Sequence, residues 1–194
     1  IKIQNSYRKE VEIDQIITYS NSELGVDIHV LPSDCFKITF LADYKQKSIG
    51  TQYGYLYSLE DQFINEIAPA RTFGLLSELK SLKEFGLIKG GNLDNAIVFS
   101  DEALSKNQAA EIKKIFGCKE DLFIDKHGIL NGKKLKFENE PVRHKILDLI
   151  GDLALLGYHI KGHIIAARSG HSSNIEIVKK IRSIEMEKKH KTNK

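Results

Sequence analysis

A histidine and two aspartates recur at helical spacing within residues 141–174. His144, Asp148 and Asp152 are each four residues apart, so on a helix their side chains project from one face. A histidine and a carboxylate one turn apart can both reach a zinc ion, whose catalytic sites keep three protein ligands. The spacing therefore supplies two ligands, His144 and Asp148. Spacing alone leaves the alternative open that these are solvated or paired groups on an ordinary amphipathic helix.

Another histidine, His171, lies near the end of this segment. The residues from Ile160 to Ala167 have the pattern of a strand that closes in a Ser-Gly-His turn. We therefore expect His171 at a strand end, where a general acid or base is often held. A histidine after a glycine is also a common turn residue, and both interpretations stay open on this evidence.

The element that must hold the first three groups begins near Pro141, which is tolerated in a first helical turn. Gly157 supplies the stop. The stretch between them carries a broad apolar stripe, typical of a helix packed on a core, made of Ile146, Leu147, Leu149, Ile150, Leu153, Leu155 and Leu156.

Two longer blocks carry a more specific signal. One reads R-H-K-I-L-D-L-I-G-D-L-A-L-L-G over residues 143–157, with R-S-G-H-S-S-N over residues 168–174. The other, within residues 70–98, contains A-R-T-F-G and then G-L-I-K-G-G-N-L-D-N-A-I-V. In this order the blocks closely resemble the zinc-dependent UDP-3-O-acyl-N-acetylglucosamine deacetylases of lipid A biosynthesis, and the chain is identified as a member of that family.

The resemblance implies hydrolysis of the N-acetyl amide of an acylated UDP-glucosamine. His144 and Asp148 match two zinc ligands, and zinc supplies a Lewis acid that activates water and polarises the amide. His171 matches the catalytic histidine, which stabilises the oxyanion or protonates the leaving amine. Asp152 matches the carboxylate that orients this histidine.

Further matches concern the substrate. Thr72 and Phe73 match positions beside the metal, where the Thr72 hydroxyl can stabilise an oxyanion; without the family, a structural threonine is an equal alternative. Tyr44 matches an aromatic residue near the nucleotide. Lys145 and Arg168 match positive positions near the sugar and phosphates.

The apolar residues of the second block recur at helical spacing and on periodicity alone indicate core. The resemblance instead implies a passage for the fatty acyl chain, lined by Leu76, Leu79, Ile88 and Val98. The pair Gly90 and Gly91 could let the backbone approach the sugar closely.

The family takes its third zinc ligand and its general base from an adjacent Glu-His pair, and residues 1–194 contain no such pair. We therefore expect residues 1–175 to be the second, carboxy-terminal domain of a two-domain deacetylase whose amino-terminal domain is absent here. Residues 176–194 are expected to form a terminal helix and a basic tail or linker. The chain alone is then expected to be inactive. The alternative is a non-catalytic acyl-lipid-binding or structural module.

The expected fold class is α+β, a two-layer sandwich of a mainly antiparallel sheet with helices on one face and an inserted strand-helix-strand unit. Residues 101–131 resemble the family least and appear as an insertion holding a capped helix, residues 105–117. The remaining expected elements are strands over residues 12–19, 25–31, 36–42 and 51–58 and a short helix over residues 59–67.

The composition argues against a membrane-spanning or a nucleic-acid-binding protein. Of the 194 residues 41% are hydrophobic and 28% charged, and no apolar run approaches the roughly 18 residues of a membrane span. Residues 176–194 carry seven Lys or Arg against three Glu, so the net charge of +3 is a tail property and a nucleic-acid surface is not expected. Cys35 and Cys118 indicate a reduced, cytoplasmic setting. Membrane contact is expected to be at most peripheral, and a hydroxyacyl dehydratase domain, fused to the deacetylase in some bacteria, could follow residue 194.

Overall fold

The computed structural model describes residues 9–86, 88 and 92–192. The chain divides into two compact units. The first unit consists of residues 1–43, 53–69 and 142–194, and the second of residues 44–52 and 70–141. In sequence, the second unit therefore interrupts the first unit twice.

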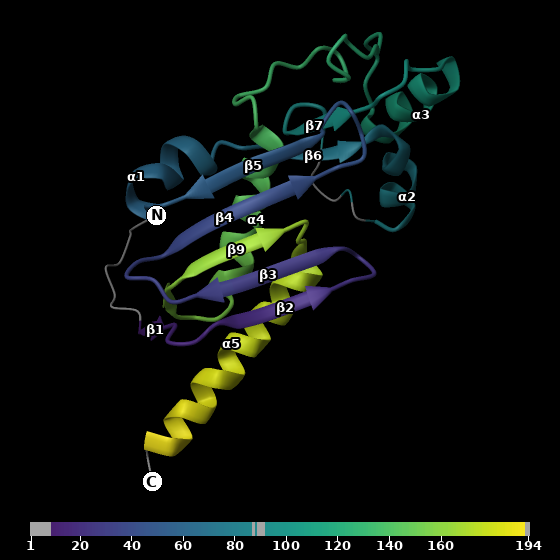
Figure 1. Ribbon diagram of the computed structural model, residues 1–194. Coiled ribbons are helices and arrows are strands. Elements are labelled where there is room, and N and C mark those ends of the chain that lie inside the picture. Colours follow the sequence, from purple (N-terminus) through teal and green to yellow (C-terminus); the bar gives the residue numbers. More distant parts are fainter. Residues whose placement is uncertain (1–8, 87, 89–91, 193–194) are drawn as a thin grey trace, which may run out of the picture. The chain divides into compact units, whose positions relative to one another are not determined.

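The first unit is built on a five-stranded sheet with the order β2-β3-β9-β4-β5 (Figure 1). β2 pairs with β3, and β3 with β9, in antiparallel fashion, whereas β4 runs parallel to β9. The expected hairpin and the two strands that follow it are thus confirmed. The strands are β2 (Ile17–Asn21), β3 (Val26–Leu31), β4 (Lys37–Asp43), β5 (Thr51–Leu56) and β9 (His163–Ala167).

Two helices, α4 (Glu140–Ala154) and α5 (His171–Thr192), cover one face of this sheet (Figure 1). Strands β3 and β4 alternate between buried and half-buried residues, so every second side chain points toward the helices. The expected α+β fold with helices on one face is confirmed. The core residues of the layers include Ile28, Val30, Ile38 and Phe40 from the sheet, Val142, Ile146 and Leu149 from α4, and Ile177 and Ile181 from α5.

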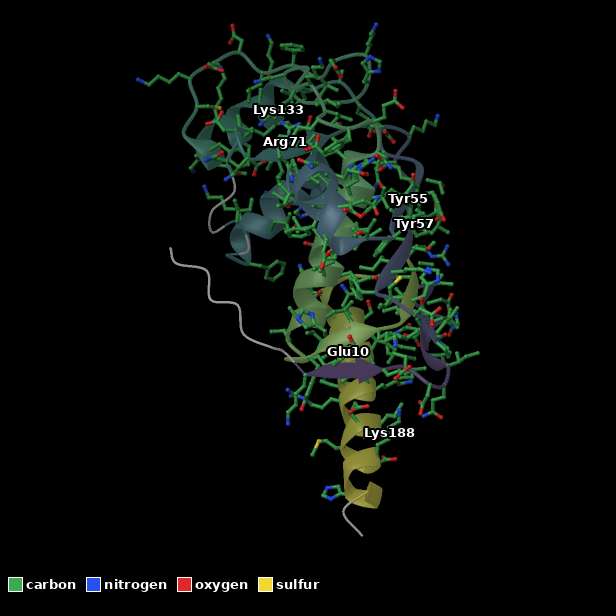
Figure 2. The ribbon with its side chains drawn as sticks, turned by 90° about the vertical axis from the view of Figure 1, so that its left-hand side faces the viewer. Glu10, Tyr55, Tyr57, Arg71, Lys133 and Lys188 are labelled. Carbon is green, nitrogen blue, oxygen red and sulfur yellow. The ribbon has the colours of Figure 1, made fainter. Side chains whose placement is uncertain are left out.

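Strand β5 has different residues on its two faces. On the helix side, a Cβ at Gly54 would lie 3.0 Å from both Val142 and Ile146, so only glycine lets α4 approach this closely. On the other side, the rings of Tyr55 and Tyr57 stack with centroids 4.7 Å apart (Figure 2). The strand thus fixes the position of the first turns of α4.

The expected strand over residues 160–167 is wrong in one respect, because it divides at Gly162 into β8 (His159–Lys161) and β9. β8 pairs in parallel with β1 (Glu10–Glu12), outside the main sheet. A Cβ at Gly162 would come within 2.7 Å of Ile13, so the chain changes sheets where only glycine fits. The expected first strand likewise begins only at Ile17, after a break that follows β1.

The short helix expected before Pro69 is present as α1 (Leu59–Gln62), which continues as one π-helical turn, η1 (Phe63–Ile67). Ser58 caps it, since its hydroxyl accepts a hydrogen bond from the amide of Asp61 at 3.3 Å.

The second unit contains the expected strand-helix-strand arrangement. β6 (Thr72–Leu75) leads through η2 (Leu76–Glu78) and α2 (Leu79–Glu84) to β7 (Ala96–Phe99), and β6 pairs with β7 in parallel. Gly90 and Gly91, which the sequence suggested as a site of close approach, lie outside the described residues.

The insertion holds the predicted helix, α3 (Lys106–Phe116). Ser105 and Gln108 form a capping box, and Gly117 ends the helix with φ of +67°. These local signals, which the sequence carries in full, specify both ends of the helix.

Helix α5 differs from expectation at both ends. It begins at His171 rather than after Asn174, and it continues through the polar residues to Thr192. The boundary expected after residue 175 therefore falls inside a helix. Across the described ranges, no helix combines the length and the apolar character that crossing a membrane requires.

Candidate active site

The polar face of α4 carries His144, Asp148 and Asp152, while its opposite face packs on the sheet. Each of these three side chains is only partly exposed, with 17% of the surface of His144 and of Asp148 accessible and 13% of Asp152. The helix therefore presents an imidazole and two carboxylates in a row, in a setting that shields them from most of the solvent.

His144 and Asp148 have the geometry of two ligands of one metal ion. His144 Nε2 lies 3.4 Å from Asp148 Oδ1. Two ligand atoms bound at 2.0–2.1 Å to a tetrahedral zinc lie roughly 3.4 Å apart, so the donor pair fits this metal without rearrangement. Nitrogen and carboxylate oxygen are also donors that zinc accepts.

Lys145 neutralises the second oxygen of the same carboxylate. Its Nζ atom donates to Asp148 Oδ2 at 2.8 Å, and only 15% of its side chain is exposed. Because Lys145 holds Oδ2, the other oxygen of Asp148 is directed toward His144. Lys145 thus orients a candidate ligand, a role that the sequence had not suggested.

His171 is the first residue of α5 and contacts α4 through its ring. Its Nδ1 atom lies 2.8 Å from Asp152 Oδ2, and its Nε2 atom lies 4.0 Å from Asp148 Oδ1. An ionised carboxylate only accepts, so Nδ1 carries the proton and Nε2 is the nitrogen that can exchange one at the site. The side chain is 69% exposed, so Nε2 is open to an incoming molecule.

Asn174, which the sequence argument did not single out, completes the support of Asp152. Its side chain is fully buried, and its Nδ2 atom donates to Asp152 Oδ2 at 2.8 Å. In the sequence, Asn174 is the last residue of the motif R-S-G-H-S-S-N, which could have pointed to it. His171 and Asn174 lie on the same side of α5, three residues apart, so the first turn of α5 binds Asp152 from two positions.

The arrangement thus combines two metal donors with an oriented imidazole. Across residues 9–86, 88 and 92–192, no group of three or more His, Cys, Asp or Glu side chains has the geometry to hold a metal ion. The described residues therefore supply a partial donor set together with a group that can transfer a proton.

Arg168, another predicted site residue, follows β9 in a left-handed conformation with φ of +55°. Its amide donates to the carbonyl of Leu41 at 2.8 Å, and its guanidinium bonds the carbonyl of Gly25 and lies 3.5 Å from Asp43. The structure thus places its side chain against the turn between β2 and β3.

The predicted aromatic residues of the second unit come together. The rings of Tyr44 and Phe73 meet edge to face with centroids 5.5 Å apart, and Phe73 contacts Phe99 in the same way at 6.2 Å. Thr72 is exposed and begins β6, where it pairs with Ala96. Within this unit, the exposed Thr72 therefore directly precedes Phe73 of the aromatic cluster along β6.

The four residues expected to line an acyl passage also gather in one place in the second unit. Leu76, Leu79 and Val98 belong to one buried apolar cluster, and Ile88 packs against it. The cluster also contains Ile112 of α3 and Leu130. The structure thus brings the four residues together, and their role as a passage for the acyl chain stays a prediction.

An ion pair that the sequence did not predict, Arg71 with Glu140, lies in the same unit. Glu140 is fully buried and bonds Arg71 through Nε at 2.8 Å, Nη2 at 2.9 Å and the amide at 2.9 Å. Burial raises the pKa of Glu140, but the bonds from Arg71 and from the Lys136 amide outweigh it and lower the pKa overall. The residues are 69 positions apart, so no local pattern could reveal the pair.

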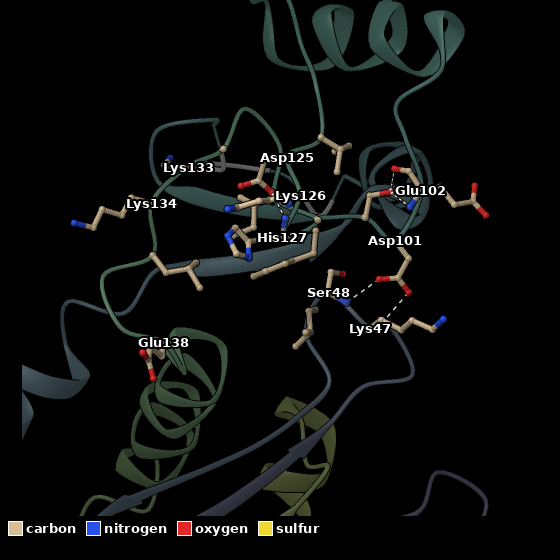
Figure 3. A pocket seen from close by; sticks show the side chains of 18 of the residues that line it. Lys47, Ser48, Asp101, Glu102, Asp125, Lys126, His127, Lys133, Lys134 and Glu138 are labelled. Carbon is tan, nitrogen blue, oxygen red and sulfur yellow. Dashed lines mark hydrogen bonds between the residues drawn. The ribbon is translucent and has the colours of Figure 1, made fainter.

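The second unit also has a hollow of about 1100 Å³, to which the sequence argument had assigned no role (Figure 3). Asp101 accepts hydrogen bonds from the amides of Lys47 and Ser48, at 2.9 and 2.8 Å, and so orders one wall. Lys133 donates to the carbonyls of Leu93, Asp94 and Ala96 and is thus structural. The hollow is rich in lysine, with Lys47, Lys126, Lys133, Lys134 and Lys136 along it.

Comparison with known proteins gives one family. The family model described as UDP-3-O-acyl N-acetylglycosamine deacetylase matches residues 1–117 and 114–183. The two matched stretches meet at the end of α3, within the segment that resembles the family least.

Individual relatives of the chain carry names that agree with this family. A UDP-3-O-acyl-N-acetylglucosamine deacetylase of Chlamydia pneumoniae is 48% identical over 151 residues, which are 77% of this chain and 45% of the relative. A bifunctional enzyme LpxC/FabZ of Chlorobaculum tepidum is 42% identical over 180 residues, 92% of this chain and 38% of the relative. The UDP-3-O-acyl-N-acetylglucosamine deacetylase of Syntrophotalea carbinolica is 38% identical over 180 residues, which are 93% of this chain and 50% of the relative. The chain thus spans half or less of the length of these relatives.

Proposed function

The chain belongs to the UDP-3-O-acyl-N-acetylglucosamine deacetylase family, and we propose that it contributes part of a zinc-dependent active site that hydrolyses the N-acetyl group of UDP-3-O-acyl-N-acetylglucosamine in lipid A biosynthesis. The observation that carries the proposal is the side-chain row of α4 together with His171. The second donor, His144, and the oriented His171 both lie within 4.0 Å of one carboxylate, Asp148.

In this proposal His144 and Asp148 hold the zinc. When bound, zinc supplies Lewis acidity, which polarises an amide carbonyl and acidifies water. The separation of 3.4 Å between the donor atoms supports zinc, as does the bond from Lys145 that leaves one Asp148 oxygen for it.

His171 acts as the proton donor to the leaving amine. Breaking the amide bond leaves an amine nitrogen that must gain a proton, and His171 Nε2 is exposed on the side of Asp148. Asp152 and Asn174 keep Nδ1 protonated and the ring in place, so the donor does not have to reorient during the reaction.

The second unit is proposed to bind the substrate. Thr72 donates its hydroxyl hydrogen to the developing oxyanion, and Phe73 and Tyr44 contact the substrate through their rings. The cluster around Leu76, Leu79, Val98 and Ile88 receives the fatty acyl chain, because its side chains offer no polar group.

Lys145 and Arg168 are proposed to bind the sugar and phosphates. Arg168 must then exchange Asp43 for a phosphate, a favourable exchange because guanidinium binds phosphate in bidentate fashion. Lys145 can contact the substrate while it still bonds Asp148, since an ammonium group has three donors.

The third zinc ligand and the general base are proposed to come from an amino-terminal domain outside these residues. The partial donor set of the described residues supports this, as does the greater length of the relatives. Deacetylation then needs that domain. A protein with both halves should release acetate from UDP-3-O-acyl-N-acetylglucosamine only with zinc, whereas release by the 194-residue chain alone would contradict the division of the site.

Two further points are proposed for the intact protein. Relatives from Chlorobaculum tepidum and Porphyromonas gingivalis are named bifunctional enzyme LpxC/FabZ, which supports a second, fused activity here, such as the dehydratase considered above. A cytoplasmic location is proposed because the substrate is a nucleotide sugar and because Cys35 and Cys118 are both free thiols.

A further inference from the structure

The acyl cluster of the second unit is closed in this structure by a residue from outside the family-like blocks. Leu76, Leu79 and Val98 are 9%, 6% and 3% exposed, so they pack on other side chains instead of lining an open channel. Helix α3 contributes the buried Ile112, 3% exposed, and its Ile115 and Phe116 pack against the cluster while partly buried.

Helix α3 lies inside the first of the two stretches that match the family model, residues 1–117. The two stretches of the family match meet at residues 114–117, the last turn of α3 and its cap. Ile112 belongs to the same buried cluster as Leu76, Leu79 and Val98, so a substrate chain that enters the cluster must meet it.

The attachment of α3 depends mainly on this apolar contact. Its polar contacts with α2 are an ion pair between Lys80 and Glu111 at 3.9 Å and a hydrogen bond from Lys83 to the carbonyl of Ile115 at 3.3 Å. Both lie at the surface, where such contacts contribute little. Residues 100–105 and 117–123, which flank the helix, have no regular secondary structure.

We infer that Ile112 is the specificity-determining residue that limits the length of the acyl chain. The inference rests on the proposed function, because it takes the cluster of Leu76, Leu79 and Val98 as the acyl site. Protein interiors are close-packed, so a methylene group that reaches Ile112 either displaces it or finds no room. Each methylene group that can be buried raises the affinity for the acyl chain about fourfold. The longest chain that fits should therefore appear as a sharp break in a series of chain lengths.

The test uses the protein with both halves and zinc, and a substrate series with straight acyl chains of about 10 to 16 carbons. We expect Ile112→Ala to move the optimum of kcat/KM toward longer chains, with the ratio of long to short substrates rising at least about tenfold. Ile112→Phe should move it in the opposite direction. A residue with a merely structural role would change kcat/KM for all lengths by one factor.

Lys114→Ala serves as the matched control, because Lys114 lies on the exposed side of the same helix. It should leave the length profile unchanged, and circular dichroism should show whether each variant is folded. A profile that stays fixed in folded Ile112→Ala and Ile112→Phe would overturn the inference.

A second readout separates this inference from the proposed function. Binding of saturated fatty acids of the same lengths to the same protein, measured by calorimetry, reports the size of the apolar site without turnover. If the unmodified protein releases no acetate, the proposed function fails, yet the two Ile112 variants still have to shift the binding profile in opposite directions. If binding shows no such shift, the assignment of Ile112 fails.

Discussion

His171 Nδ1 lies 2.8 Å from Asp152 Oδ2, and the fully buried Asn174 donates to the same carboxylate oxygen at the same distance. This relationship joins the first turn of α5 to the last turn of α4. It engages one imidazole nitrogen in a hydrogen bond and leaves the other available, the arrangement that a proton donor requires.

Replacing Asp152 by asparagine should reduce turnover with little effect on the metal. An amide can donate to Nδ1 and so favour the wrong tautomer of His171, for which we expect kcat to fall by about 100-fold to 10,000-fold. Zinc affinity should change far less, because Asp152 is not one of the two proposed zinc ligands. Steady-state acetate release and zinc titration of the intact protein measure the two effects.

Glu176→Gln on the same helix is the control, since Glu176 pairs with Lys179 at the surface. It should retain full activity. Equal losses in Asp152→Asn and Glu176→Gln would mean that α5 responds to any loss of charge, and the orienting role of Asp152 would then be abandoned.

Removal of the buried charge at Glu140 should destabilise the protein strongly. Glu140→Gln leaves the Arg71 guanidinium, only 13% exposed, without its counter-charge, which costs about 3–5 kcal/mol in comparable buried pairs. Glu66→Gln breaks a similar pair with Arg143 that is far more exposed, and we expect a loss within about 1 kcal/mol. Urea unfolding followed by far-UV circular dichroism compares the two variants. Similar losses in both would contradict the importance of burial.

Two glycines that contact or lie on α4 should respond in opposite ways to alanine. At Gly54 the new methyl group would lie 3.0 Å from Val142 and Ile146, and we expect a loss of about 1–3 kcal/mol from overpacking. At Gly151, inside the exposed part of α4, nothing lies within 4 Å, and the better helix propensity should stabilise by up to about 1 kcal/mol. Thermal unfolding of both variants tests the close approach of β5 to α4, which a stable Gly54→Ala would refute.

The free energy of unfolding should fall as the pH drops below about 6.5. Burial, and then the charge of Lys37, holds the pKa of His163 below its ordinary value of 6.5. The unfolded chain regains the ordinary pKa and takes up a proton that the folded chain resists, so acid favours unfolding. His163→Gln should flatten this dependence, since glutamine can still bond Thr39, which lies 2.9 Å from His163 Nε2. Identical pH profiles for the two proteins would exclude His163 as the cause.

Local signals predicted a large part of the fold. The Ser105 cap and Gly117 defined α3, and the apolar stripe after Pro141 defined α4, because helix ends and faces depend on residues within a few positions. The division of one expected strand at Gly162 could not be predicted in this way. It depends on Ile13, which approaches from a distant part of the sequence.

The candidate site shows the same limit. Spacing placed His144, Asp148 and Asp152 on one face of a helix, and family resemblance supplied the roles of Asp152 and His171. Lys145 on Asp148, Asn174 on Asp152 and Glu140 with Arg71 were missed, because a hydrogen-bond partner is defined by the folded geometry and not by residue type. Ile112 was predicted as helical but not as part of the acyl cluster.

The central claim is that His144 and Asp148 hold zinc. Its most direct test is zinc titration by calorimetry of the protein with both halves, alongside His144→Ala, Asp148→Ala and the control Asp121→Ala, whose side chain is fully exposed. We predict one zinc per protein, an affinity at least about tenfold weaker in the first two variants, and no change in the control. One zinc bound with unaltered affinity in both His144→Ala and Asp148→Ala would contradict the claim.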